Sequence, residues 1–280
     1  MRYIFTVVVG RSGQFSLANT INKYGKDCFA EAEPPNLLIN NKFTPSWIKI
    51  FQRKYIVTNE MLGRGEALKW FEEGLDEKIQ YQVEKKIDRI KQIRLKKDFS
   101  FYFEISKFFS RTQCEAFYKL IPSLELIKLT RNPIANAKSF LNRNKNFYLD
   151  NNSPESKINC LIMDSKSLSK FELYLWSWFE TELRFKRFVD KHNINRVFEI
   201  KTEELNSRKK IIKLFEYFEV NYDFPEQLDI LNTNFEHGLP KTLISKDDIS
   251  QYQSFLDKVP NQLIEKIDYL KNFNELKLLD

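Results

Sequence analysis

Two glycines stand three residues apart in the segment VVVGRSGQFSLANTI, residues 7–21. Glycine is scarce in this chain, with seven in 280 residues, so the pair Gly10 and Gly13 says more than it would in a glycine-rich protein. An apolar strand, a short glycine loop and a helical pattern in this order are typical of an anion site, because the loop amides and the helix amino terminus converge on one point. Arg11 adds a fixed positive charge, and nearby serines add hydroxyls. The segment therefore predicts a site for a phosphate or sulfate group.

A second candidate anion site lies in IKLTRNPIANAKSFLNR, residues 127–143. Arg131 ends a predicted strand, and Ser139 lies eight residues further on, inside the next predicted helix. At about 100° per residue, Ser139 lies nearly opposite the apolar face of that helix. Open parallel sheets bind ligands beyond the carboxyl ends of their strands. We therefore expect Arg131 and Ser139 to converge on an anion at that edge.

Strands and helices must bring these loops together. Near-continuous apolar runs, which suit parallel strands covered on both faces, occur at Arg2–Val9, Phe101–Ile105, Leu124–Thr130 and Val197–Ile200. CFAEAEPPN, residues 28–36, should begin a further strand or its loop. Helical patterns cover 76–97, 133–143, 168–191, 208–219 and the tail after Ser245, which has capping-box spacing to Asp248. The alternation predicts an α/β fold, a three-layer sandwich with a mostly parallel central sheet.

The composition is that of a soluble globular protein, with 42% hydrophobic and 30% charged residues. We expect a single domain over 1–280, with 40–100 a helical insertion and 142–169 a mobile loop. The net charge of +7 suits an anionic ligand. Three scattered cysteines are too few for a disulfide framework or a metal knuckle. Residues 3–9 are too short for a signal peptide, and nothing approaches the length of a transmembrane segment, so we expect a cytoplasmic protein without a nucleic-acid partner.

A strand followed by R-S-G, with a later LTRNPIANAKSF in which Arg131 and Ser139 stand eight apart, resembles the sulfotransferases that use 3′-phosphoadenosine-5′-phosphosulfate (PAPS). VFEIKTEEL is similar to the late strand of that family and its acidic-leucine turn, and a helix follows it. The resemblance covers most of residues 3–220, with the specific motifs in 9–17 and 124–141. It implies a P-loop NTPase-like fold, PAPS as donor, adenosine 3′,5′-bisphosphate as product, and no metal requirement.

In that family the first loop binds the 5′-phosphosulfate and the later Arg/Ser pair binds the 3′-phosphate. Carried over residue by residue, the 5′ site comprises Gly10, Arg11, Ser12, Gly13, Gln14, Phe15 and Ser16, and the 3′ site comprises Arg131 and Ser139. The family usually has two hydroxyl residues after the glycine, where this chain has Gln14 and Phe15. Gln14 can still donate a hydrogen bond, whereas Phe15 cannot. Ser16 could compensate from the next position.

The acceptor hydroxyl needs a base within hydrogen-bond reach. Sulfotransferases carry a glutamate base near the second strand, often in a Glu-Pro or Glu-Glu pair. The resemblance therefore implies Glu33, which precedes Pro34, with Glu31 as the second candidate. Of the two histidines, His192 belongs to a predicted surface turn, and His237 lies in a region that the sequence does not place.

Positive side chains complete the predicted site. Ser106 and Lys107 follow the strand at 101–105, where the family often has a lysine-hydroxyl pair near the transferring group. Lys107 and Arg11 would neutralise charge that develops during transfer; a surface strand end is the other interpretation of Lys107. Lys241 is a weaker candidate for the 3′-phosphate.

Three functions remain open. The first is in-line transfer of a sulfuryl group from PAPS to a hydroxyl of a saccharide, glycolipid or small metabolite, with a carboxylate base. The second is a nucleotide-dependent kinase with a degenerate phosphate loop, against which the missing G-K-[ST] counts. The third is a non-enzymatic polyanion-binding protein, suggested by the basic runs Lys85–Arg94 and Arg208–Lys213. The sequence names neither the acceptor nor the oligomeric state.

Overall fold

The computed structural model describes residues 1–33, 43–55, 58–142, 146–224, 243–271 and 273. The strands in these ranges are β1 (Arg2–Val8), β2 (Cys28–Ala32), β3 (Phe101–Ile105), β4 (Glu125–Thr130) and β5 (Val197–Lys201). The helices are α1 (Gln14–Tyr24), α2 (Ser46–Tyr55), α3 (Glu66–Glu72), α4 (Asp76–Lys97), α5 (Cys114–Leu120), α6 (Pro133–Leu141), α7 (Lys170–His192), α8 (Arg208–Tyr217), α9 (Lys246–Leu256), α10 (Asn261–Ile264) and α11 (Asp268–Lys271). A π-helical turn, Phe109–Gln113, precedes α5.

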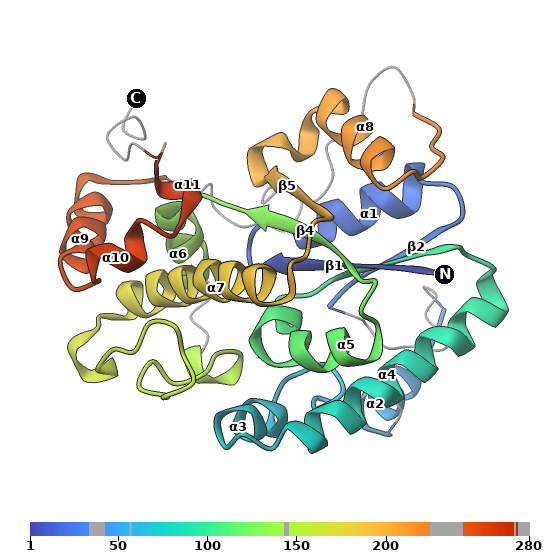
Figure 1. Ribbon diagram of the computed structural model, residues 1–280, viewed down its shortest axis with the longest axis horizontal. Coiled ribbons are helices and arrows are strands. Elements are labelled where there is room, and N and C mark those ends of the chain that lie inside the picture. Colours follow the sequence, from blue (N-terminus) through green and yellow to red (C-terminus); the bar gives the residue numbers. More distant parts are fainter. Residues whose placement is uncertain (34–42, 56–57, 143–145, 225–242, 272, 274–280) are drawn as a thin grey trace.

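The five strands form one parallel sheet in the order β2-β3-β1-β4-β5. β1 is central, with β2 and β3 on one side and β4 and β5 on the other. The strands run toward the same side of the molecule, the left in Figure 1. Loops from both halves of the sheet therefore meet beyond the end of β1, where open α/β sheets bind their ligands.

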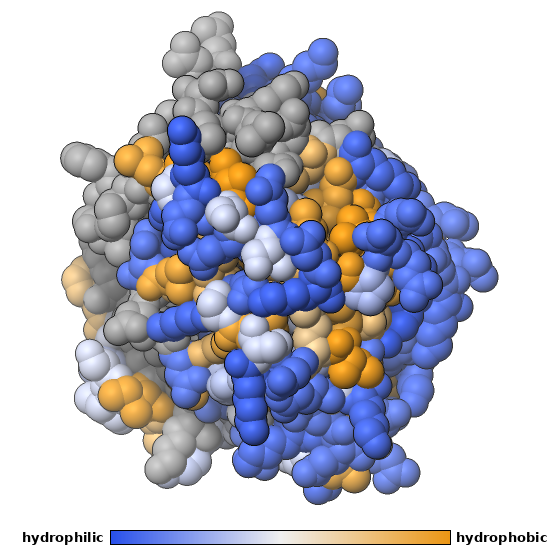
Figure 2. All heavy atoms as spheres, turned by 90° about the vertical axis from the view of Figure 1, so that its left-hand side faces the viewer, coloured by the Kyte–Doolittle hydropathy of each residue, from blue (hydrophilic) through white to orange (hydrophobic). Residues whose placement is uncertain are grey.

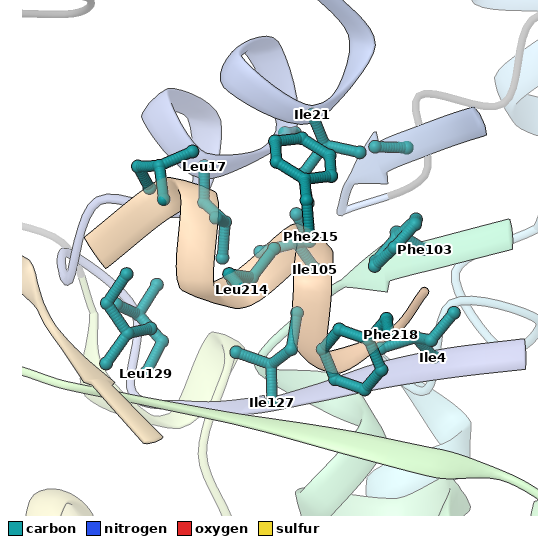
Figure 3. Packing of buried hydrophobic residues seen from close by; sticks show 14 of the residues in the cluster. Ile4, Leu17, Ile21, Phe103, Ile105, Ile127, Leu129, Leu214, Phe215 and Phe218 are labelled. Carbon is teal, nitrogen blue, oxygen red and sulfur yellow. The ribbon is translucent and has the colours of Figure 1, made fainter. Parts of the chain in front are cut away.

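Helices cover both faces of the sheet (Figure 1). α1 and α8 lie on one face, and α4, α5 and α7 lie on the other. On the first face Leu17 and Ile21 of α1 pack with Ile4 of β1 and Phe215 of α8, as Figure 3 shows. On the second face Phe5 of β1 stacks against the π-helical turn. Because both faces are covered, the inner strands β1, β3 and β4 are buried with little alternation, and every residue of β4 is buried. The edge strand β5 exposes Glu199 and Lys201.

The predicted α/β sandwich is confirmed, and the four predicted strands agree with β1, β3, β4 and β5 to within one residue. The pattern at 76–97 is α4, and α9 begins with both bonds of the capping box between Ser245 and Asp248. Residues 28–36 form a strand as far as Ala32, so Glu31 lies inside β2 and Glu33 just beyond it.

Two connections contain the segments predicted as an insertion and a mobile loop. α2, α3 and α4 lie between β2 and β3. The connection from α6 to α7, described from residue 146, has two short 3-10 turns and is tied to α7. The Glu180 carboxylate accepts from the backbone of Leu161 at 2.8 Å, and Trp176 Nε1 donates to the Leu161 carbonyl at 2.8 Å. The single domain, the insertion and the mobility of the loop stay predictions.

Candidate active site

The glycine loop leaves the end of β1 and turns directly into α1. Arg11 and Gly13 both have left-handed backbone conformations, with φ of 69° and 86°. Gly13 is the N-cap of α1 and offers no capping side chain, and the first turn contains no acid. The first amides of a helix have no intrahelical acceptor and carry partial positive charge. This end of α1 is therefore suited to an anion.

The two predicted anion motifs contact each other. Arg11 Nε donates to Ser139 Oγ at 3.2 Å, and Arg131 Nη1 donates to the Arg11 carbonyl at 2.7 Å. Asn136 of α6 adds two bonds from its side-chain Nδ2, at 2.8 Å to the Gly10 carbonyl and 3.1 Å to a serine hydroxyl of the loop. Residues about 120 positions apart in the chain therefore form one basic cluster at the ends of β1 and β4.

A hydrogen bond from α7 fixes the backbone of Arg131. Trp178 Nε1 of α7 donates to its carbonyl at 2.8 Å. Burial lowers the pKa of the Arg131 guanidinium, and the nearby Glu203 carboxylate opposes that effect. An arginine nevertheless remains charged at neutral pH. A partly desolvated cation attracts an anion more strongly than one in water.

The two unusual residues after the glycine have opposite environments. Gln14 is 5% exposed, and its Nε2 has no hydrogen-bond partner in the part of the chain that the structure describes. An unpaired buried amide is costly, which is consistent with a donor reserved for a bound group. Phe15 is 56% exposed and contributes an apolar surface instead. Ser12 is buried and Ser16 is partly exposed.

Lys107 lies at the end of β3 between two carboxylates. Its Nζ donates to Asp150 Oδ2 at 2.8 Å and lies 3.6 Å from Glu33 Oε1. The Lys107 side chain is only 7% exposed, and burial lowers the pKa of its ammonium, an effect that Glu33 and Asp150 oppose. Glu33 is more accessible, at 28%. The arrangement places an accessible carboxylate beside a buried cation.

The structure places Glu31 in a different environment. Its carboxylate accepts from Arg89 at 2.5 and 3.1 Å and from the Tyr102 hydroxyl at 2.9 Å. All three side chains are buried between the sheet and α4. A carboxylate with this many partners is not available to take a proton from a substrate, so the geometry favours Glu33.

The remaining sequence candidates are Ser106, His192, His237 and Lys241. Ser106 is buried, and its Oγ accepts from the backbone amide of Phe108 at 3.2 Å. His192, the last residue of α7, lies 2.9 Å from a carboxylate oxygen of Glu115, away from the ends of the strands. His237 and Lys241 lie outside the described residues.

Three contacts were not found from the sequence. Asn136 could have been, because it lies one turn before Ser139 on the same helix. Thr202 also could have been, because it directly follows β5; its Oγ1 donates to the carbonyl of Ser12 at 3.0 Å. No motif in the sequence pointed to Asp150, because it reaches Lys107 from the long connection between α6 and α7.

Within the described ranges, no cluster of three or more histidine, cysteine, aspartate or glutamate side chains could hold a metal ion. Nor is any described helix both long and apolar enough to cross a membrane. Figure 2 faces the side toward which the strands run, and its visible surface is mostly hydrophilic with separate apolar patches.

No protein-family model matches the sequence, and no curated protein matches it. Among solved structures, the chain is similar to a sulfotransferase from Alicyclobacillus acidocaldarius, with a TM-score of 0.50 and 14% identity over 100% of this chain and 99% of that one. A sulfotransferase domain from the curacin biosynthetic pathway gives 0.45 and 14%, over 81% and 78% of the two chains. A sulfotransferase domain from the Synechococcus PCC 7002 olefin synthase gives 0.46 and 13%, over 91% and 94%. The five-stranded parallel sheet with helices on both faces and the first of these likenesses together show that the chain has the sulfotransferase fold.

Proposed function

We propose that this protein is a sulfotransferase that moves a sulfuryl group from PAPS to a hydroxyl group. The single observation that carries the proposal is the contact between the two anion motifs. The Arg11 side chain donates to Ser139, and the Arg11 backbone carbonyl accepts from Arg131. A donor that carries a 3′-phosphate and a 5′-phosphosulfate on the same ribose could bind both motifs at once. The missing P-loop lysine favours this donor over a nucleoside triphosphate.

The described residues fit such a donor. The first-turn amides of α1 and the unpaired Nε2 of Gln14 would bind the 5′-phosphosulfate with Arg11. Arg131 and Ser139 would bind the 3′-phosphate. When bound, the donor supplies the sulfuryl group and leaves as adenosine 3′,5′-bisphosphate once its sulfur–oxygen bond breaks.

Two side chains at the ends of β2 and β3 would carry the catalytic roles. Glu33 takes the proton from the acceptor hydroxyl while the acceptor oxygen attacks in line. Lys107 offers a buried positive charge for the oxygen atoms that gain charge during transfer. Arg11, at the loop, offers another. The acceptor class that we propose is a saccharide, glycolipid or small metabolite bearing a hydroxyl.

The test compares two ligands and then a reaction. We expect adenosine 3′,5′-bisphosphate to bind more tightly than ATP with magnesium in isothermal titration calorimetry. A screen with sulfur-labelled PAPS against candidate acceptors and cell extracts, followed by mass identification of the product, then identifies the acceptor. Tighter binding of ATP with magnesium would refute the proposal and favour a kinase.

A further inference from the structure

A compact cluster of charges surrounds the ring of Phe108. Lys107 Nζ and the guanidinium carbons of Arg64 and Arg111 lie 5.0, 5.5 and 5.9 Å from the ring centroid. Asp150 contacts all three cations. Three positive side chains therefore lie around one aromatic ring, and all three contact Asp150.

Asp150 uses different atoms for each partner. Its Oδ2 accepts from Lys107 at 2.8 Å, and its Oδ1 forms an ion pair with Arg64 Nη2 at 2.9 Å. Its backbone carbonyl accepts from Arg111 Nη1. Burial alone would raise the pKa of the Asp150 carboxyl, but Lys107, Arg64 and Arg111 outweigh that effect and lower it. Asp150 is therefore a fixed negative charge at neutral pH.

The turn that bears Asp150 is anchored to α7. Arg111 Nη2 donates to Ser177 Oγ at 3.2 Å, and the Ser177 hydroxyl donates to Asn151 Oδ1 at 2.8 Å. Asn151 Nδ2 in turn donates to the Phe147 carbonyl at 2.7 Å. Neutral and charged bonds thus hold the Asp150 carboxylate in place from both sides of the turn.

Lys107 has only one ammonium for two acids. It lies 0.8 Å closer to Asp150 than to Glu33, the two distances being 2.8 and 3.6 Å. We infer that Asp150 is a positioning residue that holds Lys107 back from Glu33, so that the Glu33 carboxylate stays free to accept a proton from the acceptor hydroxyl. This inference rests on the proposed function and adds to it a residue from the connection between α6 and α7.

Few charged groups face the two carboxylates of Glu33 and Asp150. In the described chain, Glu33 interacts electrostatically with Lys107 and with the more distant Arg111. Asp150 faces Lys107, Arg64 and Arg111, and its charge also raises the pKa of Tyr174, together with the larger effect of burial. Removing the charge of Asp150 therefore leaves Glu33 as the nearest acid to Lys107.

The test is the Asp150→Asn variant, which preserves the side-chain shape and removes the charge. Lys107 should then approach Glu33 from 3.6 Å to about 2.8 Å. A closer ammonium makes this carboxylate a weaker base, so we expect the acidic limb of the kcat/KM profile to move to lower pH. We also expect turnover at the plateau to fall between about threefold and tenfold, because the base is weakened.

Three controls separate positioning from a loss of folding. Asp164→Asn, an exposed aspartate of the same connection, should leave the pH profile unchanged. Binding of adenosine 3′,5′-bisphosphate to Asp150→Asn should stay within about twofold of wild type. In a Lys107→Met background, adding Asp150→Asn should cause no further loss, because Asp150 acts through Lys107.

The outcomes distinguish this inference from the function on which it rests. An unshifted acidic limb in Asp150→Asn, with Glu33→Gln inactive, would overturn the inference and leave the sulfotransferase proposal standing. Additive losses in the Lys107→Met background would also overturn it. Failure of wild-type protein to bind adenosine 3′,5′-bisphosphate would instead remove the proposed function.

Discussion

Replacing Arg131 by alanine should remove most of the selectivity for a 3′-phosphate. The guanidinium is the basic group that ends β4, and its partial burial strengthens each bond to an anion. A hydrogen bond to a charged group contributes about 1.5–3 kcal/mol. At 1.4 kcal/mol for each factor of ten, we expect the Kd for adenosine 3′,5′-bisphosphate to rise by about 10- to 150-fold.

The assay is a thermodynamic cycle with two ligands. Isothermal titration calorimetry measures the binding of adenosine 3′,5′-bisphosphate and of adenosine 5′-monophosphate, which lacks the 3′-phosphate, to wild type and to Arg131→Ala. The variant should lose affinity for the first ligand and little for the second. Arg131→Lys should retain part of the affinity, because it keeps the charge without the bidentate geometry.

Arg196→Ala is the matched control. Arg196 precedes β5 at the opposite end of the sheet, where it pairs with Glu125, and its loss should leave both affinities unchanged. Equal loss for both ligands in Arg131→Ala would refute the reasoning, because Arg131 would then support the shape of the loop through its bond to the Arg11 carbonyl. Unchanged affinities for both would place the 3′-phosphate elsewhere.

Four further predictions concern two glutamates, the loop and the thiols. Glu33→Gln should keep its thermal stability and donor affinity but lose at least about 100-fold in kcat, as for loss of a general base. Glu31→Gln should destabilise the fold by about 3–5 kcal/mol in urea unfolding, because it leaves the buried charge of Arg89 unpaired. Gly13→Ala should lose at least about 1–2 kcal/mol of unfolding free energy, because φ is +86° and the new Cβ would lie 2.4 Å from a leucine side chain. Burial raises the pKa of the Cys28 and Cys114 thiols to about 12 and that of the Cys160 thiol to about 11. All three should therefore react slowly with a disulfide reagent at pH 8, and about tenfold faster for each added pH unit until the pH reaches those values. The free energy of unfolding should fall as the pH rises from about 9 through those values.

Each of these has an outcome that contradicts it. Wild-type turnover in Glu33→Gln would place the base elsewhere. Wild-type stability in Glu31→Gln would show that its ion pair is not needed, and wild-type stability in Gly13→Ala would show that the loop tolerates a side chain. Rapid thiol reaction at pH 8 in the folded protein would mean that the cysteines are more accessible than their burial implies.

Local patterns in the sequence predicted the strands and the longer helices, but not the π-helical turn and α5 that follow β3. The anion-binding roles of the two motifs stay predictions. The apolar runs predicted the parallel strands because a doubly covered sheet buries both sides of each strand, as every residue of β4 shows. Gly10 and Gly13 marked the loop because glycine permits backbone conformations that other residues rarely adopt. Arg131 and Ser139 were found because their spacing follows from one strand end and one helix.

The tertiary structure alone decided how these pieces are paired. Two glutamates stand two residues apart, one in β2 and one just beyond it. Glu31 is paired with Arg89 of α4, whereas Glu33 lies at the edge of the sheet beside Lys107. Residues two apart in a strand point to the same face, but β2 ends at Ala32 and Glu33 has a left-handed backbone with φ of 48°. The partners of the two glutamates depend on elements far along the chain. Asp150 likewise reaches Lys107 from 43 residues away. Sequence periodicity predicts the local geometry of a helix or strand. Charge pairs between residues far apart in the chain depend on packing and are seen only in the folded structure.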